Sequence, residues 1–246
     1  MNRSPQLGID LGGSKIEIIA LHEGRELLRH RIATPQGDYR ATVAAICNLI
    51  TQAEQQLGRH GSVGVGIPGS RSPDHGRIKN ANSVCLIGED LQGDLQQALQ
   101  RPVALANDAD CFSLSEATDG AGENAATVFG VILGTGVGGG IVVNGRLLQG
   151  PNAIAGEWGH NPMPWPRAAT GAAIDCYCGK QDCIETFLSG PGWAARSGLG
   201  ISAEQLAASV RQGNPQAIQA LGRYCEDLAR GLAAVINLLD PHVIVL

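Results

Sequence analysis

The stretch LGIDLGGSKIEIIAL, residues 7–21, holds two short apolar runs with a glycine turn between them. The first run ends at Asp10 and the second begins at Ile16. Strands are rich in β-branched residues and are bounded by turn formers, so this stretch predicts a strand, a tight turn and a second strand. Residues 26–31 alternate weakly and predict a third strand.

The same order of elements recurs in the second half of the chain. An apolar run over 127–133 leads into GTGVGGG, residues 134–140, and a strand resumes at Ile141. Asn144-Gly145 then signals a hairpin turn. The recurrence indicates a weak internal duplication. We expect two α/β domains, which cover residues 1–122 and 123–246.

Helical spacing of apolar residues and capping residues predict the remaining elements. Asp38 can cap a helix from Tyr39 to about Leu57, and a long helix begins at Pro215 with one apolar stripe. Further helices are expected over 91–100, 109–119, 184–188 and 203–212, and further strands over 62–67, 103–106 and 243–246. The stripe of the long helix comprises Ile218, Leu221, Tyr224, Cys225, Leu228, Leu232, Val235, Ile236 and Leu239.

Composition excludes several classes of function. The 246 residues carry a formal charge of −5 without a basic block, so we expect no binding to nucleic acid. No apolar run reaches 18 residues and the start of the chain is polar, so we expect neither a membrane span nor a signal peptide. The cysteines that lie in apolar patterns read as reduced core residues, which favours a cytoplasmic protein. These are Cys47, Cys85, Cys111 and Cys225.

A dense group of metal-ligand residues lies between residues 157 and 185. His160 is followed by Cys176, Cys178 and Cys183, and thiolates with an imidazole are the ligands that zinc prefers. Scattered thiols in a loop are the plainer interpretation. A disulfide between Cys176 and Cys178 is unattractive, because nothing else in the sequence suggests an oxidising compartment, and no redox CxxC is present. We predict a closed structural zinc site made by these four residues.

The two glycine turns are candidates for binding phosphate. Without side chains, a tight turn can point several backbone N–H groups at one anion, and Ser14, Lys15 and Thr135 can add to the cradle. A plain hairpin is the alternative for each turn alone. No Walker A pattern occurs, and the GxGxxG match at 134–139 leads into a strand rather than a helix, which disfavours a Rossmann oxidoreductase.

Polar residues at three places can handle a substrate. Asn107-Asp108 follow a strand, where α/β sheets place ligands, and a carboxylate there can take a proton from a hydroxyl; a helix N-cap is the equal alternative. Glu157 and Glu185 flank the predicted zinc loop, which would turn ordinary solvated side chains into fixed acceptors for hydroxyl groups. His160 has a second ring nitrogen for a ligand. Trp158 and Trp165 are expected to pack the loop.

Together these motifs resemble the ROK family of bacterial sugar kinases. The resemblance covers nearly the whole chain, and within the family it is strongest with the fructokinase (manno-fructokinase) branch. The stretches that carry it are DLGGSK (10–15), KNANS (79–83), Asn107-Asp108, GTGVGGG (134–140), AGEWGHNP (155–162) and CYCGKQDCIET (176–186).

The resemblance implies an actin/hexokinase-like fold of two ribonuclease-H-like α/β domains, and ATP-dependent phosphorylation of fructose or mannose to the 6-phosphate. Asp108 would be the general base, and the sugar would also contact Asn107, Glu157, His160 and Glu185. ATP phosphates would bind at Gly12, Gly13, Ser14 and Lys15, and at Gly134, Thr135, Gly136, Gly138 and Gly139. Mg²⁺ would lie near Asp10, Zn²⁺ would be structural, and a homodimer is expected.

The chain departs from that family in three respects. An aromatic residue that is common in the family's loop after the Asn pair is replaced here by Cys85 or a neighbour. The family usually has Gly where Asp182 stands, but Asp tolerates a left-handed backbone, so we expect zinc binding to survive. Family members also continue past residues 243–246 into a glycine-rich adenosine motif, which suggests a truncated C-terminal part. A catalytically impaired sugar-binding remnant and, with less support, a ROK transcriptional regulator are the alternative functions.

Overall fold

The computed structural model describes residues 4–81, 83–165 and 173–246. Asn82, which belongs to one of the stretches that carry the family resemblance, lies outside these ranges. The described residues form two compact units, and the division falls within helix α3 (Asp108–Asp119). Unit 1 comprises the described residues up to Cys111 together with Gln149–Ile154, and unit 2 comprises those of Phe112–Leu148 and Ala155–Leu246. The predicted boundary between residues 122 and 123 stays a prediction.

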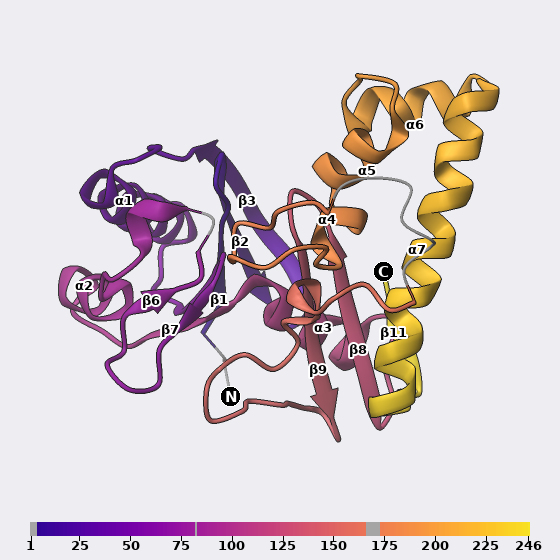
Figure 1. The fold of residues 1–246 in the computed structure, drawn as a ribbon. Coiled ribbons are helices and arrows are strands. Elements are labelled where there is room, and N and C mark those ends of the chain that lie inside the picture. The colour runs from indigo at the N-terminus through magenta and orange to yellow at the C-terminus, as the bar shows by residue number, and fades with distance from the viewer. Residues whose placement is uncertain (1–3, 82, 166–172) are drawn as a thin grey trace. The chain divides into compact units, whose positions relative to one another are not determined.

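Unit 1 contains a five-stranded sheet with the order β3-β2-β1-β4-β7. The first three strands are antiparallel, whereas β1, β4 and β7 run parallel, and helices α1 and α2 belong to the same unit (Figure 1). The bounds are β1 Gln6–Leu11, β2 Lys15–His22, β3 Arg25–Ala33, α1 Tyr39–Leu57, β4 Ser62–Ile67, α2 Leu91–Leu99 and β7 Val103–Asn107. Two short strands, β5 (Ser70–Arg71) and β6 (Ile78–Lys79), and the 3-10 helix η1 (Val84–Leu86) complete the unit.

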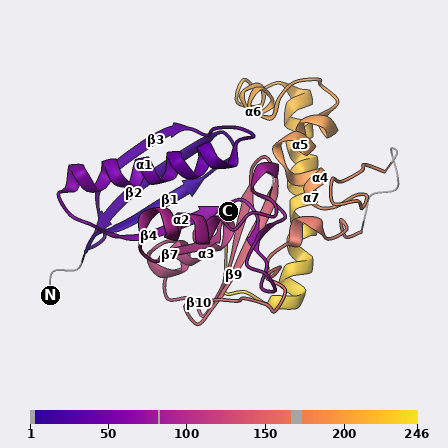
Figure 2. The same cartoon turned by 90° about the vertical axis from the view of Figure 1, so that its left-hand side faces the viewer.

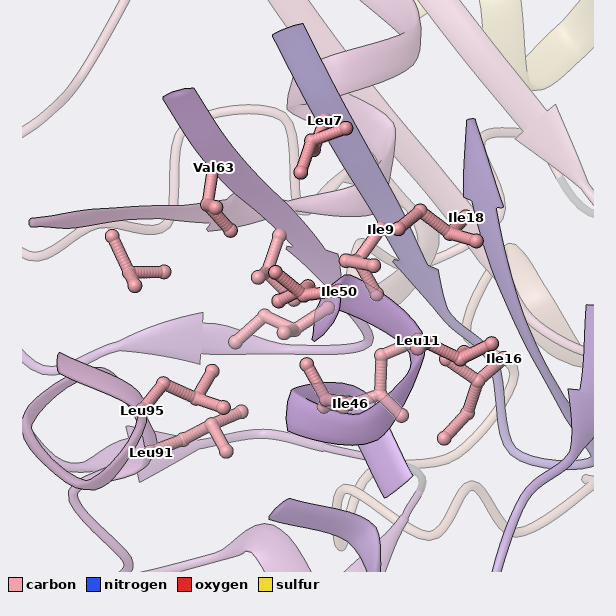
Figure 3. Packing of buried hydrophobic residues seen from close by; sticks show 14 of the residues in the cluster. Leu7, Ile9, Leu11, Ile16, Ile18, Ile46, Ile50, Val63, Leu91 and Leu95 are labelled. Atoms are coloured by element: carbon pink, nitrogen blue, oxygen red, sulfur yellow. The ribbon is translucent and has the colours of Figure 1, made fainter. Parts of the chain in front are cut away.

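The core of unit 1 lies between the sheet and α1. Figure 2 shows α1 lying along the sheet. Alternate residues of β1 are buried, and they meet Ile46 and Ile50, which lie one turn apart on α1 (Figure 3). α1 begins where predicted, because the Asp38 side chain accepts a hydrogen bond from Ala41 N–H, and it ends at Gly58, whose φ is 65°. The sequence pattern therefore fixes this helix at both ends.

A buried carboxylate ties the end of α1 to its neighbours. Glu54 accepts hydrogen bonds from Arg101 Nη1 (2.7 Å), from Gly61 N–H (2.9 Å) and from His60 Nδ1 (2.8 Å). Burial alone would raise the pKa of Glu54, but these partners outweigh it and hold the pKa below its ordinary 4.5. The charged form is therefore the one that the fold stabilises.

Glu54→Gln should lower the free energy of unfolding at pH 7 by about 1–3 kcal/mol, because the Arg101 charge loses its buried partner. The pKa of Glu54 is lowered, so its contribution is complete above the unfolded value and is lost as the pH falls through the folded value. The difference between the two proteins should therefore shrink below about pH 4 in urea titrations. Glu26→Gln is the matched control, since it removes an exposed partner of Arg29; an equal effect of both variants would contradict the prediction.

Unit 2 contains a four-stranded sheet with the order β10-β9-β8-β11. The long helix α7 runs beside this sheet in Figure 1, and its Leu228, Leu232 and Val235 pack with Phe129 of β8. The bounds are β8 Thr127–Leu133, β9 Val137–Val143, β10 Arg146–Leu147, η2 Trp158–His160, α4 Glu185–Leu188, α5 Gly190–Ser197, α6 Ala203–Arg211, α7 Pro215–Leu239 and β11 Val243–Val245. The predicted hairpin at Asn144-Gly145 is confirmed, with φ values of 50° and 71°.

Two expectations about unit 2 were wrong. β9 begins at Val137, so the last glycines of GTGVGGG lie in a strand rather than in a turn. The stripe of α7 is wrong at Ile218, Cys225 and Ile236, which are exposed, whereas Ala217, Ala220 and Gly231 are buried. The C-terminal strand is only partly buried, and β8 is its partner in the sheet.

Cys111, like Cys225, is exposed, so two of the four cysteines that read as core residues were misassigned. Among the described residues, no helix combines the length and the apolarity that crossing a bilayer requires.

Candidate active site

The parallel strands of unit 1 bring several predicted site residues to one edge of the sheet. Asp10 is the penultimate residue of β1, Gly69 follows β4, and Asn107-Asp108 stand where β7 joins α3. Because the carboxyl ends of parallel neighbours meet at the same edge, these residues lie together although they are far apart in the sequence. This edge is where open α/β sheets bind ligands.

Asn107 is held by both ends of its amide. Nδ2 donates to Gly69 O (2.9 Å), and Oδ1 accepts from the backbone N–H groups of Ala109 (2.9 Å) and Asp110 (3.2 Å). The interpretation as a helix cap is therefore correct for Asn107, which also ties β4 to the start of α3. Its contact with a sugar stays a prediction.

Asp108 is the first residue of α3, and its Oδ1 accepts from Ala109 N–H (2.8 Å). Burial raises the pKa of Asp108 above its ordinary 3.8, and the charge of Asp10 raises it further. Asp10 has a raised pKa as well, through burial and through Glu17. Two carboxylates with raised pKa values at one edge suit a hard divalent cation, because oxygen ligands and negative charge are what Mg²⁺ requires.

The first glycine turn is closed by its own backbone. Gly12 N–H donates to Lys15 O (2.9 Å), and Thr34 fixes the turn through Oγ1, which donates to Gly12 O (2.8 Å). The N–H of Gly12 is therefore already hydrogen-bonded within the hairpin. A phosphate would have to bind the N–H groups of Gly13 and Ser14. Both are exposed at the tip of the turn, as is Lys15. The turn is thus a closed hairpin that can still offer a phosphate the ammonium group of Lys15 and the backbone N–H groups of Gly13 and Ser14.

The second glycine turn is shorter than the sequence suggests. Gly134 N–H donates to Gly136 O (3.0 Å), and Gly134 O accepts from Gly190 N–H at the start of α5 (2.8 Å). Gly138 and Gly139 belong to β9. A Cβ on Gly139 would lie 2.9 Å from Trp158 and 3.0 Å from Phe129, so packing alone explains this glycine. Phosphate binding by residues 134–139 stays a prediction.

The backbone of AGEWGH, residues 155–160, packs closely against the backbone of β9. A Cβ on Gly156 would lie 2.2 Å from Gly139 O, and one on Gly159 would lie 2.3 Å from Val137 O. Trp158 is buried and its Nε1 donates to Gly138 O (2.9 Å), which confirms that it packs the loop. Trp165, in contrast, is 64% exposed, so the same expectation was wrong there.

The four predicted metal ligands converge in unit 2. The ligand atoms of His160, Cys176, Cys178 and Cys183 all lie within 4.8 Å of one another. His160 Nδ1 is 3.6 Å from Cys176 Sγ, and the sulfurs of Cys178 and Cys183 are 3.6 Å apart. One imidazole and three thiols at these separations can surround a single tetrahedral ion after small adjustments, so the donor set fits zinc.

The backbone of the loop is built to hold those sulfurs. Cys176 N–H donates to Lys180 O (2.8 Å), and Gly179 N–H donates to Cys176 O (2.9 Å), which makes a tight turn around Cys178. Asp182 has a φ of 51°, so it adopts the left-handed conformation expected of a residue that replaces Gly. Burial raises the pKa of the Cys183 thiol to about 12, so without a metal this thiol stays protonated.

Glu185 joins the cysteine loop to the second glycine turn. Its side chain is buried, and Oε2 accepts from Val137 N–H (2.9 Å) at the first residue of β9. One carboxylate oxygen therefore has a structural role, and the contact of Glu185 with a sugar stays a prediction. The sequence gives no direct signal for this bond, because the N–H of Val137 becomes available only once β9 begins there.

Sequence reasoning also missed Tyr177, which stands between two cysteines of the loop. Its hydroxyl lies 3.0 Å from His160 Nε2. Partial burial and the charges of Glu185 and Glu157 raise the pKa of Tyr177 to about 12, so the phenol is protonated at neutral pH. The sequence carries no direct signal for this contact, because neighbouring side chains of an extended segment point to opposite sides.

The described residues thus include two aspartates at one edge of the sheet of unit 1, two glycine turns, and a cluster of one histidine and three cysteines in unit 2. A model of the ROK family matches residues 6–246. The chain belongs to the ROK family. It is 39% identical over 249 residues to an N-acetyl-D-glucosamine kinase from Pectobacterium atrosepticum, with 97% of this chain and 82% of the relative covered.

Solved structures agree with this assignment. A ROK family glucokinase from Streptomyces griseus, in complex with glucose and AMPPNP, superposes with a TM-score of 0.81 at 28% identity and covers 98% of this chain and 81% of its own. A ROK family transcriptional regulator, a homolog of the E. coli MLC protein, also has a TM-score of 0.81, at 26% identity, but only 64% of that chain is covered.

The chain is accordingly an ATP-dependent, hexokinase-type sugar kinase of the ROK family. The predicted actin/hexokinase-like α/β fold is confirmed. The fructokinase branch is not singled out, because the similar curated relatives are N-acetyl-D-glucosamine kinases.

Proposed function

We propose that this ROK kinase phosphorylates N-acetyl-D-glucosamine. The observation that carries the proposal is the 39% identity, over 97% of the chain, to a relative with that activity. Fructose or mannose, phosphorylated to the 6-phosphate, is the second candidate and rests on the resemblance of CYCGKQDCIET, residues 176–186, to the fructokinase branch. The division at residues 122 and 123 is proposed on the recurrence of strand, glycine turn and strand in both halves, and a homodimer is proposed on the resemblance to the ROK family.

Asp108 is proposed as the general base. It would take the proton from the sugar hydroxyl while that oxygen bonds to the γ-phosphorus and the bond to the ADP oxygen breaks. A raised pKa suits this role, because the best base has a pKa closer to the working pH than an ordinary aspartate. Asn107, Glu157, His160 and Glu185 are proposed to hold the other hydroxyls.

The nucleotide is proposed to bind at the two glycine turns. In the first turn, the exposed Gly13, Ser14 and Lys15 fit a phosphate, whereas Gly12 N–H already serves the hairpin. In the second, Gly134, Thr135 and Gly136 precede the strand that holds Gly138 and Gly139. Mg²⁺ is proposed near Asp10, where it would neutralise phosphate charge when bound.

Zinc is proposed to be structural. The cluster of His160, Cys176, Cys178 and Cys183 supplies four protein ligands, and structural zinc sites are filled by four such groups. Bound zinc would fix the ring of His160. It would also restrain the carboxylate of Glu185, because Glu185 follows the ligand Cys183 by only two positions in the chain. Its role would be to hold sugar ligands in place rather than to react.

The test is ADP release by the purified chain with Mg²⁺ and ATP. N-acetyl-D-glucosamine should give the highest kcat/KM in a panel with fructose, mannose, glucose and N-acetylmannosamine. Highest turnover with fructose or mannose would overturn the first candidate and support the second. Absence of turnover with every sugar, in folded and zinc-loaded protein, would support the impaired sugar-binding remnant instead.

A further inference from the structure

The hydroxyl of Tyr177 contacts Nε2 of His160, the ring nitrogen that does not face the cysteine cluster. The hydroxyl lies 3.0 Å from Nε2, and the two rings meet edge to face, with centroids 5.2 Å apart and planes at 86°. Tyr177 is nevertheless 68% exposed. A largely exposed aromatic side chain is thus docked on a predicted sugar ligand.

The surroundings of His160 assign its two nitrogens. Nδ1 faces the cysteine cluster, 3.6 Å from Cys176 Sγ, so it is the nitrogen that would take a metal. Nε2 must then carry the ring hydrogen and act as a donor. A single N–H makes one good hydrogen bond, and in this structure Tyr177 Oη occupies that position.

We propose that Tyr177 and the sugar compete for His160 Nε2–H, so that Tyr177 must move away before a sugar hydroxyl can bind there. The inference rests on the proposed function, because it requires His160 to bind sugar. Release is geometrically easy: Tyr177 is mostly exposed, and the turn that carries it is held by backbone bonds of Cys176 and Gly179 rather than by the phenol. Tyr177 therefore acts as a positioning residue that weakens sugar binding.

The test compares sugar affinity in wild type, Tyr177→Phe and Tyr177→Leu. Titration calorimetry without ATP measures Kd for N-acetyl-D-glucosamine and for D-fructose, and zinc content is measured on the same samples. Both variants should bind the preferred sugar about two- to tenfold more tightly, the range expected when a competing neutral hydrogen bond is removed. KM should fall by the same factor while kcat is unchanged.

Tyr39→Phe is the matched control, because it removes a phenol that donates to Asp94 within unit 1. It should leave Kd for sugar unchanged. An unchanged or higher Kd in both Tyr177 variants, at wild-type zinc content, would overturn the inference and leave the proposed function intact. Loss of zinc in both variants would overturn it too, since Tyr177 would then belong to the metal loop. Failure of the zinc-loaded wild type to bind any sugar would refute the proposed function itself, and the inference with it.

Discussion

Asp108→Asn should lower kcat about 10²–10⁴-fold while changing the KM for sugar far less. The amide keeps the shape of the side chain and can still accept from Ala109 N–H, so α3 should fold normally. What is lost is the group that removes the hydroxyl proton during phosphoryl transfer. Steady-state kinetics with the preferred sugar measures the effect.

The pH profile provides the second readout for Asp108. Its pKa is raised, so the base becomes protonated at a higher pH than an ordinary aspartate, and wild-type kcat should fall as the pH drops through that raised value. The residual activity of Asp108→Asn should not follow this profile. Asp119→Asn, the same substitution at the exposed end of α3, is the control. Near-normal kcat in Asp108→Asn would remove Asp108 from the role.

Cys183→Ser should empty the predicted zinc site. Zinc content should fall from about one ion per chain to near zero, because Cys183 is fully buried at the cluster and serine is a poor zinc ligand. Affinity for the sugar should drop at least ~10-fold, since His160 and Glu185 lose the ion that orients them. Elemental analysis and sugar titration on the same sample measure both effects.

Cys225→Ser separates this effect from general loss of a thiol. Cys225 lies exposed on α7 and is not one of the clustered ligands, so this variant should retain zinc and bind sugar like the wild type. Equal zinc content in wild type, Cys183→Ser and Cys225→Ser would show that the ion, if any, is held elsewhere.

Local chemistry determines most of the elements that the sequence predicted correctly. α7 starts at Pro215 because Asn214 Oδ1 accepts from Gln216 and Ala217 N–H, and α6 is preceded by a complete capping box at Ser202. The metal ligands were recognisable for the same reason. Ligand type and spacing already restrict which ion four side chains can surround.

The errors arise where packing overrides local pattern. GTGVGGG has the composition of a turn, yet Gly139 is a strand residue because Trp158 and Phe129 occupy the space of its missing side chain. α5 was missed because Gly190-Pro191-Gly192 reads as a chain break, whereas Ser189 caps a helix there. Helical periodicity placed Ile218 and Ile236 of α7 inside, but both are exposed, and the start of α7 instead buries Ala217 and Ala220 against Leu206 of α6.

The hydrogen bond from Val137 N–H to Glu185 connects the cysteine loop to the strand that follows the second glycine turn. A ligand that restrains the cysteine loop is therefore expected to restrain the second glycine turn, and the reverse. Thermodynamic reciprocity then follows: the free energy by which zinc favours the arrangement of the turn equals the free energy by which an occupant of the turn favours zinc retention. If zinc binds the loop and a nucleotide phosphate binds the turn, as proposed above, loss of the metal should weaken nucleotide binding by the same factor by which loss of the nucleotide weakens zinc binding.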